Sequence, residues 1–238
     1  KLKLNKRKYK RGDFFMVKLH YYGHSAFMFS YKDIPILLVD PFLTNNPWEK
    51  QKASDVECDF ILVSHAHSDH LGDTIEIAKR TQATVISTAE IANLCVENDV
   101  LAHSMHIGGK YNFPFGWVRV TQAFHGSGIS GGHACGFIFS FYGKTIYFAG
   151  DTGIFGDMEL LGQLEEIDYA LLPIGDNFTM GPSDAALAAK LLNPKKVIPM
   201  HYQTWPIIDQ DPEKYKQLTE SKYKIPVQVV LPGEIIKL

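Results

Sequence analysis

Four side chains that can bind metal ions fall within six residues of the segment SHAHSDHLGD, namely His65, His67, Asp69 and His70. Histidine nitrogen and carboxylate oxygen are ligands that suit first-row divalent metals. The segment follows an apolar stretch, and a tight turn after a strand can aim alternate side chains at two points. His65 and His67 could then serve one ion, and Asp69 and His70 a second. The alternative, a chance cluster of surface histidines, explains this spacing less well.

Three more candidate ligands each follow an apolar stretch of the chain. They are His125 in AFHGSG, Asp151 in FAGDTG and His201 in PMHY. A rigid sheet can hold a ligand at the end of a strand. A lone histidine in such a place is more often structural, but each of these residues fills a position that the first motif leaves open.

Short apolar strands separated by turn residues are expected to position these side chains. The segment 16–29 reads as strand, turn and strand, and further strands are expected over 34–40, 59–65, 83–87, 117–124, 135–141, 145–151, 168–174, 195–201 and 226–231. Helices are expected over 73–81, 88–98 and 183–192. Several strands are apolar on both faces, which favours sheets covered by helices.

The chain of 238 residues, 45% of them hydrophobic, can bury a sizeable core. Residues 1–15 carry seven of the 24 Lys and Arg and a single acid, so the remainder has 17 basic and 25 acidic residues, a net charge of −8. We expect a basic leader over 1–15, disordered or foreign to the natural protein, and one domain over 16–238. A genuine basic arm is the alternative for the leader.

The composition also limits the kinds of binding partner and the cellular location that the sequence predicts. An acidic body is poorly suited to a nucleic-acid backbone, and no apolar run approaches the ~20 residues that span a bilayer. The three cysteines, Cys58, Cys95 and Cys135, are odd in number and include no CxxC pair, so a disulfide framework is not expected. These features predict a cytoplasmic protein without a membrane partner; the oligomeric state cannot be read from them.

The order H-x-H-x-D-H, then His, Asp and His resembles the metallo-β-lactamase superfamily, from about Met16 to Leu238. The chain is most similar to small stand-alone members described as predicted metal-dependent hydrolases, and more distantly similar to ascorbate-phosphate lactonase. The phrases that carry this resemblance are GHSAF, VDPF, SHAHSDHLGD, PIGDNFTMGPSDA and KKVIPMHY.

The resemblance implies a four-layer αβ/βα sandwich, an α/β (α+β) fold of two mixed sheets flanked by helices. It also implies two divalent metal ions per chain. One is held by His65, His67 and His125, and the other by Asp69, His70 and His201, with Asp151 bridging the two. Zinc is favoured, and manganese, iron and nickel are alternatives. An oxygen-reducing di-iron relative would carry Glu in place of His67, which argues against redox chemistry.

Several further residues are candidates for roles around the metals. Asp69 is expected to orient the nucleophile as well as bind metal. His24 in GHSAF could protonate a leaving group, although a structural role is the alternative. Asp40 could hydrogen-bond a ligand histidine or cap the turn before Pro41. A loop after a strand supplies three residues that could contact substrate or ligands: Asp176, Asn177 and Thr179.

Two cations close together lower the pKa of a shared water, so that hydroxide forms at neutral pH. We therefore expect a hydrolase that attacks an ester, a lactone or a phosphodiester of a small, anionic substrate. A nuclease is one alternative, ranked lower because residues 16–238 show no inserted basic arm. A non-catalytic metal-binding protein of the same fold is the other, and the complete ligand set argues against it.

Overall fold

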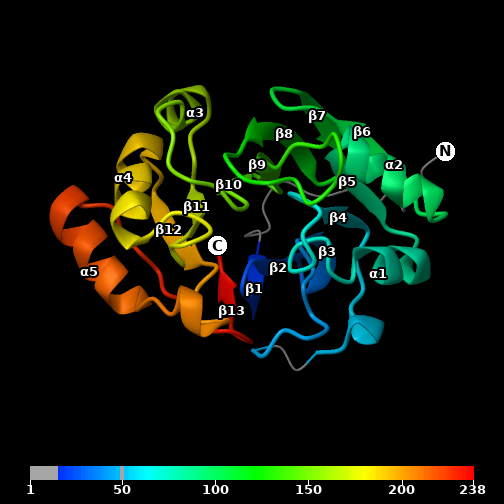
Figure 1. Ribbon diagram of the computed structural model, residues 1–238, viewed down its shortest axis with the longest axis horizontal. Coiled ribbons are helices and arrows are strands. Elements are labelled where there is room, and N and C mark those ends of the chain that lie inside the picture. Colours follow the sequence, from blue (N-terminus) through cyan, green and yellow to red (C-terminus); the bar gives the residue numbers. More distant parts are fainter. Residues whose placement is uncertain (1–15, 49–50) are drawn as a thin grey trace.

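The computed structural model describes residues 16–48 and 51–238 and contains two β-sheets that pack face to face. The first sheet has the order β13-β1-β2-β3-β4-β5-β6, and the second has the order β12-β11-β10-β9-β8-β7 (Figure 1). The strands of the first sheet are β1 (Val17–Gly23), β2 (Ala26–Tyr31), β3 (Ile34–Val39), β4 (Phe60–Leu62), β5 (Thr84–Thr88), β6 (Ala102–Met105) and β13 (Ile235–Lys237). Those of the second are β7 (Lys110–Phe113), β8 (Gly116–Gln122), β9 (Cys135–Phe141), β10 (Lys144–Phe148), β11 (Tyr169–Pro173) and β12 (Lys196–Met200).

Helices flank both sheets, as Figure 1 shows. Helices α1 (Thr74–Thr81) and α2 (Ala89–Glu97) pack on the first sheet, and α2 contacts β5 and β6. Helices α3 (Met158–Leu164), α4 (Pro182–Leu192) and α5 (Pro212–Tyr223) lie on the side of the second sheet, where α4 contacts β11. Two short 3-10 helices cover 53–55 and 206–208. The predicted four-layer sandwich is therefore confirmed.

Alternating side chains explain why the central strands are apolar on both faces. In β2, Phe27 and Phe29 enter the core between the sheets, while Ala26 and Met28 enter the core under α1 and α2. Successive side chains of a strand point to opposite faces, so a strand covered on both sides needs apolar residues at every position. A sequence of this kind fits a buried layer and would be poorly suited to a solvent-facing sheet.

The strand directions bring the predicted ligands to matching edges of the two sheets. In the second sheet, β8 and β10 are each antiparallel to β9, and β10, β11 and β12 are parallel, so β8, β10 and β12 end at one edge. His125, Asp151 and His201 follow these ends within three residues. In the first sheet β1, β3 and β4 likewise share a direction, and the segments that follow them carry His24, Asp40 and the H-x-H-x-D-H motif.

Most predicted elements are confirmed with ends shifted by a few residues, and the hairpin of β9 and β10 turns at Tyr142 and Gly143. The strand predicted over 226–231 is wrong. That segment makes one isolated bridge, between Val197 and Val227, and the last strand is β13. Val227 and Val230 are buried. The apolar pattern of this segment therefore reflects burial in the core and not hydrogen bonding to a neighbouring strand. The predicted leader over 1–15 lies outside the described residues.

Strands β6, β7 and β13 and helices α3 and α5 were not predicted. The three cysteines are buried and unpaired. No helix within 16–48 or 51–238 is both long and apolar enough to cross a membrane.

Candidate metal centre

Three histidines converge at the first of two groups of ligand atoms. The Nε2 atom of His65 lies 2.9 Å from Nδ1 of His67, and Nε2 of His125 lies 3.3 Å from the same Nδ1. All three atoms can face one ion. Two ligands that bind one ion at about 2.1 Å lie roughly 3.0–3.4 Å apart, so the observed spacing suits a shared metal.

The second group consists of His24, Asp69, His70 and His201, whose ligand atoms all lie within 4.8 Å of one another. Nε2 of His70 lies 3.8 Å from Oδ2 of Asp69. His24, His70 and His201 are buried, whereas the Asp69 side chain is 22% exposed. Asp69 therefore lies on the solvent side of this group.

Asp151 lies between the two groups. Its Oδ2 atom is 3.6 Å from Nε2 of His125 in the first group and 3.0 Å from Nε2 of His201 in the second. Its Oδ1 atom is 3.3 Å from Nε2 of His70. A carboxylate in this position can bind two ions at once, one through each group.

The polar atoms at the centre of the site fit bound cations better than they fit one another. Nε2 of His70, Oδ1 of Asp151 and both ring nitrogens of His201 are buried and have no hydrogen-bond partner among residues 16–48 and 51–238. Unpaired polar atoms in a protein interior are costly. Because these atoms converge on one space and are all metal-ligand types, a divalent ion would satisfy them together.

Asp40 anchors the far side of His70. Its Oδ2 atom lies 2.7 Å from Nδ1 of His70 and accepts a hydrogen bond of 2.5 Å from the Ser64 hydroxyl, while Oδ1 accepts one from the Ser64 main-chain N–H. The Ser64 hydroxyl also lies 3.0 Å from Nδ1 of His65. Such outer contacts fix the orientation and tautomer of a ligand histidine. Asp40 thus contacts a predicted ligand, and its left-handed backbone also forms the turn before Pro41.

The charges of the site follow from burial and from the neighbouring ionisable groups. Burial lowers the pKa of His65 to about 2, with His70 adding to the effect. Burial also opposes ionisation of Asp151, but His201 and His70 outweigh it and hold the pKa of that carboxyl well below its usual value. For His70, burial is outweighed by Asp151 and Asp40, which raise its pKa well above 6.5. Asp151 is thus an ionised carboxylate, which is the form that binds a cation.

His24 is fully buried beside the second group. Its Nε2 atom lies 3.1 Å from Oδ2 of Asp69, and its Nδ1 atom lies 2.7 Å from the Thr204 hydroxyl. Burial lowers the pKa of His24 to about 3, and His201 adds to the effect. A proton donor must reach the leaving group, and a ring with no exposed surface is poorly placed to do so. The predicted donor role stays a prediction.

The loop that holds Asp176, Asn177 and Thr179 is attached next to Asp151, because the Met180 N–H donates to the carbonyl of Thr152. Within the described part of the chain, the hydrogen bonds of the three predicted residues are local to the loop. None of the three belongs to either ligand group. Sequence reasoning overlooked Ser64 and Thr204. Ser64 adjoins the motif and could have been noticed, whereas Thr204 lies 180 residues from His24 and gave no signal.

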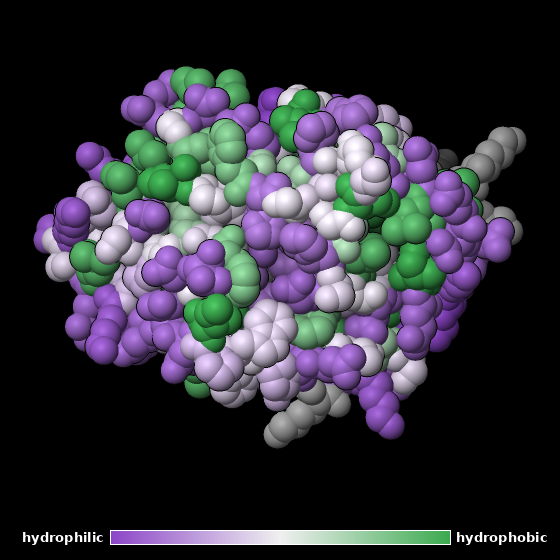
Figure 2. Space-filling view, viewed as in Figure 1, coloured by the Kyte–Doolittle hydropathy of each residue, from purple (hydrophilic) through white to green (hydrophobic). Residues whose placement is uncertain are grey.

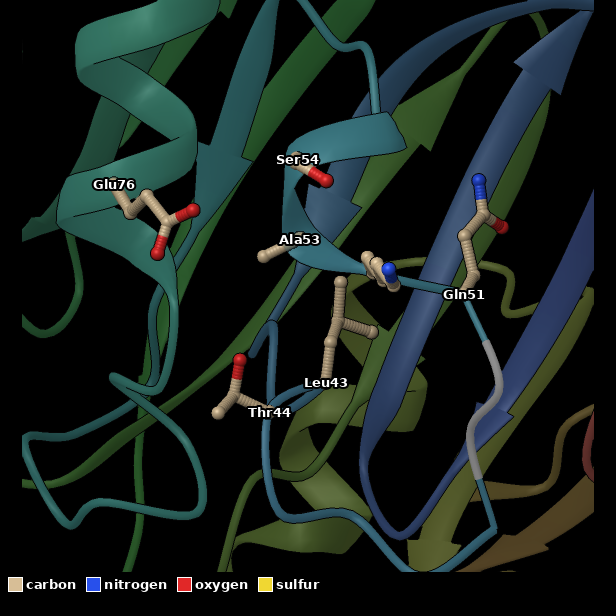
Figure 3. Close-up of a pocket in the computed structure, with 7 residues that line it drawn as sticks. Leu43, Thr44, Gln51, Ala53, Ser54 and Glu76 are labelled. Atoms are coloured by element: carbon tan, nitrogen blue, oxygen red, sulfur yellow. The ribbon is translucent and has the colours of Figure 1, made fainter.

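A hollow of about 420 Å³ opens beside Asp69 and is lined by Phe42, Thr44, Asn45, Ser68, Asp69, Gly72, Asp73 and Trp205. Figure 2 shows hydrophilic side chains gathered in the middle of one face of the molecule, with apolar surface on either side. A second hollow shares only Thr44 with the first and contains none of the predicted ligands; Figure 3 shows its walls around Leu43, Ala53 and Glu76. The hollow beside Asp69 is therefore the one that adjoins the metal ligands.

Comparisons with known proteins agree with this geometry. The family model described as Beta-lactamase superfamily domain matches residues 18–201. A UPF0173 metal-dependent hydrolase of Desulforamulus reducens is 50% identical over 230 residues, which cover 93% of this chain and 100% of the relative. A protein of the same description from Pelotomaculum thermopropionicum is 46% identical over the same shares of both chains.

Solved structures show the same fold. Igni18, described as a novel metallo hydrolase from the hyperthermophilic archaeon Ignicoccus hospitalis, is 38% identical, with a TM-score of 0.87 over 94% of this chain and 98% of its own. The metallo-β-lactamase fold protein YhfI of Bacillus subtilis matches with a TM-score of 0.73 at 12% identity, over 94% of this chain and 100% of its own. The chain therefore belongs to the metallo-β-lactamase superfamily and, within it, to the UPF0173 family of metal-dependent hydrolases. The predicted family and class of enzyme are confirmed.

Proposed function

We propose that this protein hydrolyses an ester, a lactone or a phosphodiester of a small anionic substrate with two divalent metal ions, zinc being favoured. The observation that supports this most is the position of Asp151, whose two oxygens face ligand atoms of both groups. When bound, a pair of such ions generates a strong nucleophile from water at neutral pH and stabilises the negative charge that develops on the substrate.

The side chains of the protein have separate tasks in this proposal. His65, His67 and His125 hold one ion, Asp69, His70 and His201 hold the other, and Asp151 joins the two. Burial raises the pKa of Asp69, but the contact with His24 together with His70 outweighs burial and leaves the pKa below its usual value. Asp69 is thus an ionised carboxylate on the solvent side, where it can accept a proton from the attacking water and orient it.

The substrate is expected to enter through the hollow beside Asp69. Phe42 and Trp205, whose ring centroids lie 6.1 Å apart, form its apolar wall. The lining includes no Lys or Arg, so the metal ions are the cations that would meet a negatively charged reacting group. The part of the substrate that does not react would rest against the two aromatic rings.

Metal content and turnover test this proposal together. Protein loaded with zinc or manganese and then desalted should contain close to two ions per chain by elemental analysis. It should hydrolyse at least one member of a panel of nitrophenyl phosphodiesters, nitrophenyl esters and lactones, and a chelator should stop the reaction. Consistent values near one ion per chain would contradict the dinuclear centre. Two bound ions without turnover on the panel would favour a non-catalytic metal-binding protein.

A further inference from the structure

We propose that His24 is itself a ligand of the second metal ion, through Nε2. The centre as a whole would then have eight protein ligands instead of the seven that the motif order assigns. This inference rests on the proposed dinuclear centre and adds a residue from the turn between β1 and β2. Four observations support it: the position of Nε2, the contact of Nδ1, the backbone of the turn and the burial of the ring.

The Nε2 atom of His24 faces the same space as the other donors. It lies 3.1 Å from Oδ2 of Asp69, a spacing that falls between the 2.9 Å and 3.3 Å that separate the donors of the first group. The ring also lies against a predicted ligand, since the centroids of His24 and His201 are 4.0 Å apart. The 3.1 Å between Nε2 of His24 and Oδ2 of Asp69 is the separation expected of two ligand atoms that bind one ion.

The nitrogen of His24 that faces away from the metal site, Nδ1, contacts a polar side chain, as the Nδ1 atoms of two other histidines do. Nδ1 of His24 lies 2.7 Å from the hydroxyl of Thr204, Nδ1 of His65 lies 3.0 Å from that of Ser64, and Nδ1 of His70 lies 2.7 Å from Asp40. A ligand histidine usually donates its outer N–H to such a partner, which leaves the lone pair of the inner nitrogen free for the metal. With its outer N–H on Thr204, His24 presents Nε2 as a ligand.

The backbone locks His24 onto the strand end that carries His201. The His24 carbonyl accepts a 2.6 Å hydrogen bond from the His201 N–H and a 2.9 Å bond from the Tyr21 hydroxyl. His24 also has a φ of 57°, a left-handed conformation that is uncommon and strained for a residue other than glycine. The chain maintains this strained turn with the histidine fixed beside its neighbour ligand.

The enclosure of the ring separates the ligand role from the proton-donor role. Phe42 and Trp205 pack edge-on against His24 at centroid distances of 5.6 Å and 4.9 Å, and the residue has no exposed surface. A proton donor needs contact with the leaving group. A metal ligand needs none, and His65, His70 and His201 are buried to the same extent.

Metal binding to two variants tests the inference without relying on activity. His24→Ala removes the imidazole, and His24→Asn does so with a residue that tolerates positive φ, so at least one should keep the turn folded. We expect both to bind the first ion as the wild type does and the second at least ~100-fold more weakly, the upper end of the loss seen when a metal-supporting side chain is removed. His20→Asn is the matched control, because His20 lies on β1 and belongs to none of the ligand groups.

X-ray absorption of the wild-type protein with two zinc ions measures the number of imidazole ligands. The seven-ligand centre has five imidazoles in all, and the centre with His24 has six. The variants loaded at high zinc concentration should show one imidazole fewer than the wild type. Variants that keep both affinities and the wild-type imidazole count would overturn the inference and leave the seven-ligand centre intact. A wild-type protein that binds only one ion would instead contradict the proposed function, so the two failures are distinguishable.

Discussion

At the scale of single residues, the site gathers ionised carboxylates and ring nitrogens that a bound cation would satisfy. Asp151 and Asp69 are ionised, and the inner atoms of His70 and His201 have no hydrogen-bond partner in the part of the chain that the structure describes. Asp40 and Ser64 fix the outer atoms of His70 and His65. The arrangement therefore restrains the ligands before a metal binds, which lowers the ordering cost of binding.

Asp151→Asn tests the bridging position. The amide keeps the size of the side chain but removes the negative charge between two cations, so we expect the pair of ions to bind at least ~100-fold more weakly and turnover to be lost. Calorimetric zinc titration and elemental analysis measure the first effect. Asp157→Asn, on an exposed residue of the following segment, is the control and should bind both ions. Tight binding of two ions by Asp151→Asn would rule out the bridge.

The ligand positions could be predicted from the sequence because they are locally encoded. The spacing of H-x-H-x-D-H is a property of one turn, and His125, Asp151 and His201 each follow an apolar strand. The surrounding contacts could not be predicted in this way. The contact between His24 and Thr204 joins residues far apart in the chain, and nothing local to either residue indicates the other.

At the scale of elements, the turn that carries the motif is docked on the turn after β3. Asp73 accepts hydrogen bonds from the N–H groups of Leu43 and Thr44, and its own N–H donates to Pro41. Gly72 has a φ of 42°, and a Cβ there would lie 2.3 Å from the Pro41 carbonyl oxygen. The Gly and Asp that end SHAHSDHLGD thus position the motif against the segment that contains Asp40.

Gly72→Ala should therefore separate the two turns. Both the backbone conformation and the contact with Pro41 oppose a methyl group, and we expect a loss of about 2–4 kcal/mol in the free energy of unfolding. Gly108→Ala is the control, since Gly108 has a φ of 89° but no atom within 4 Å of a Cβ, and it should cost about 1 kcal/mol. Urea unfolding measures both. Equal losses would show that the docking of the turns is unimportant.

The elements that sequence reasoning missed are those whose stability does not depend on a long apolar pattern. Helix α5 has the polar sequence PEKYKQLTESKY and buries little besides Pro212, Tyr215 and Thr219. The start of this helix could have been predicted, because Asp211 caps it ahead of a proline at the first helical position. Strand β13 has three residues and pairs with β1 at an edge, and pairing of this kind is decided by tertiary contacts.

At the scale of the whole molecule, the two sheets fold into one framework whose strand ends supply both ligand groups. The central core includes residues of both sheets, such as Phe29 of β2 and Phe139 of β9, whose rings meet edge-on at 5.2 Å. The first sheet positions His24, His65, His67, Asp69 and His70, and the second positions His125, Asp151 and His201. Each metal would therefore bind residues of both sheets, and its binding should stabilise the packing of the whole protein.

The stability of the metal-free protein should accordingly depend on pH through its buried histidines. In the unfolded chain His24 and His65 take up protons near pH 6.5, whereas in the folded protein burial, together with His201 beside His24 and His70 beside His65, lowers their pKa values to about 3 and about 2. Below pH 6.5 the unfolded state therefore binds more protons, and the free energy of unfolding falls as the pH falls, by about 1 kcal/mol per pH unit for each group.

Two further buried groups with raised pKa values, His70 and Asp40, change this expectation little or oppose it. His70, whose pKa is raised by Asp151 and Asp40 against the effect of burial, is protonated in both states below pH 6.5 and adds little slope there, whereas above pH 6.5 it is protonated in the folded protein alone and opposes the trend. Asp40, whose pKa is raised by burial, works in the opposite direction but is one group against two. Chelator-treated protein should lose about 1–3 kcal/mol between pH 6.5 and pH 4.5 in urea unfolding, and His65→Asn should reduce this loss. A metal-free protein that is equally stable at both pH values would show that these histidines are not buried in the neutral form.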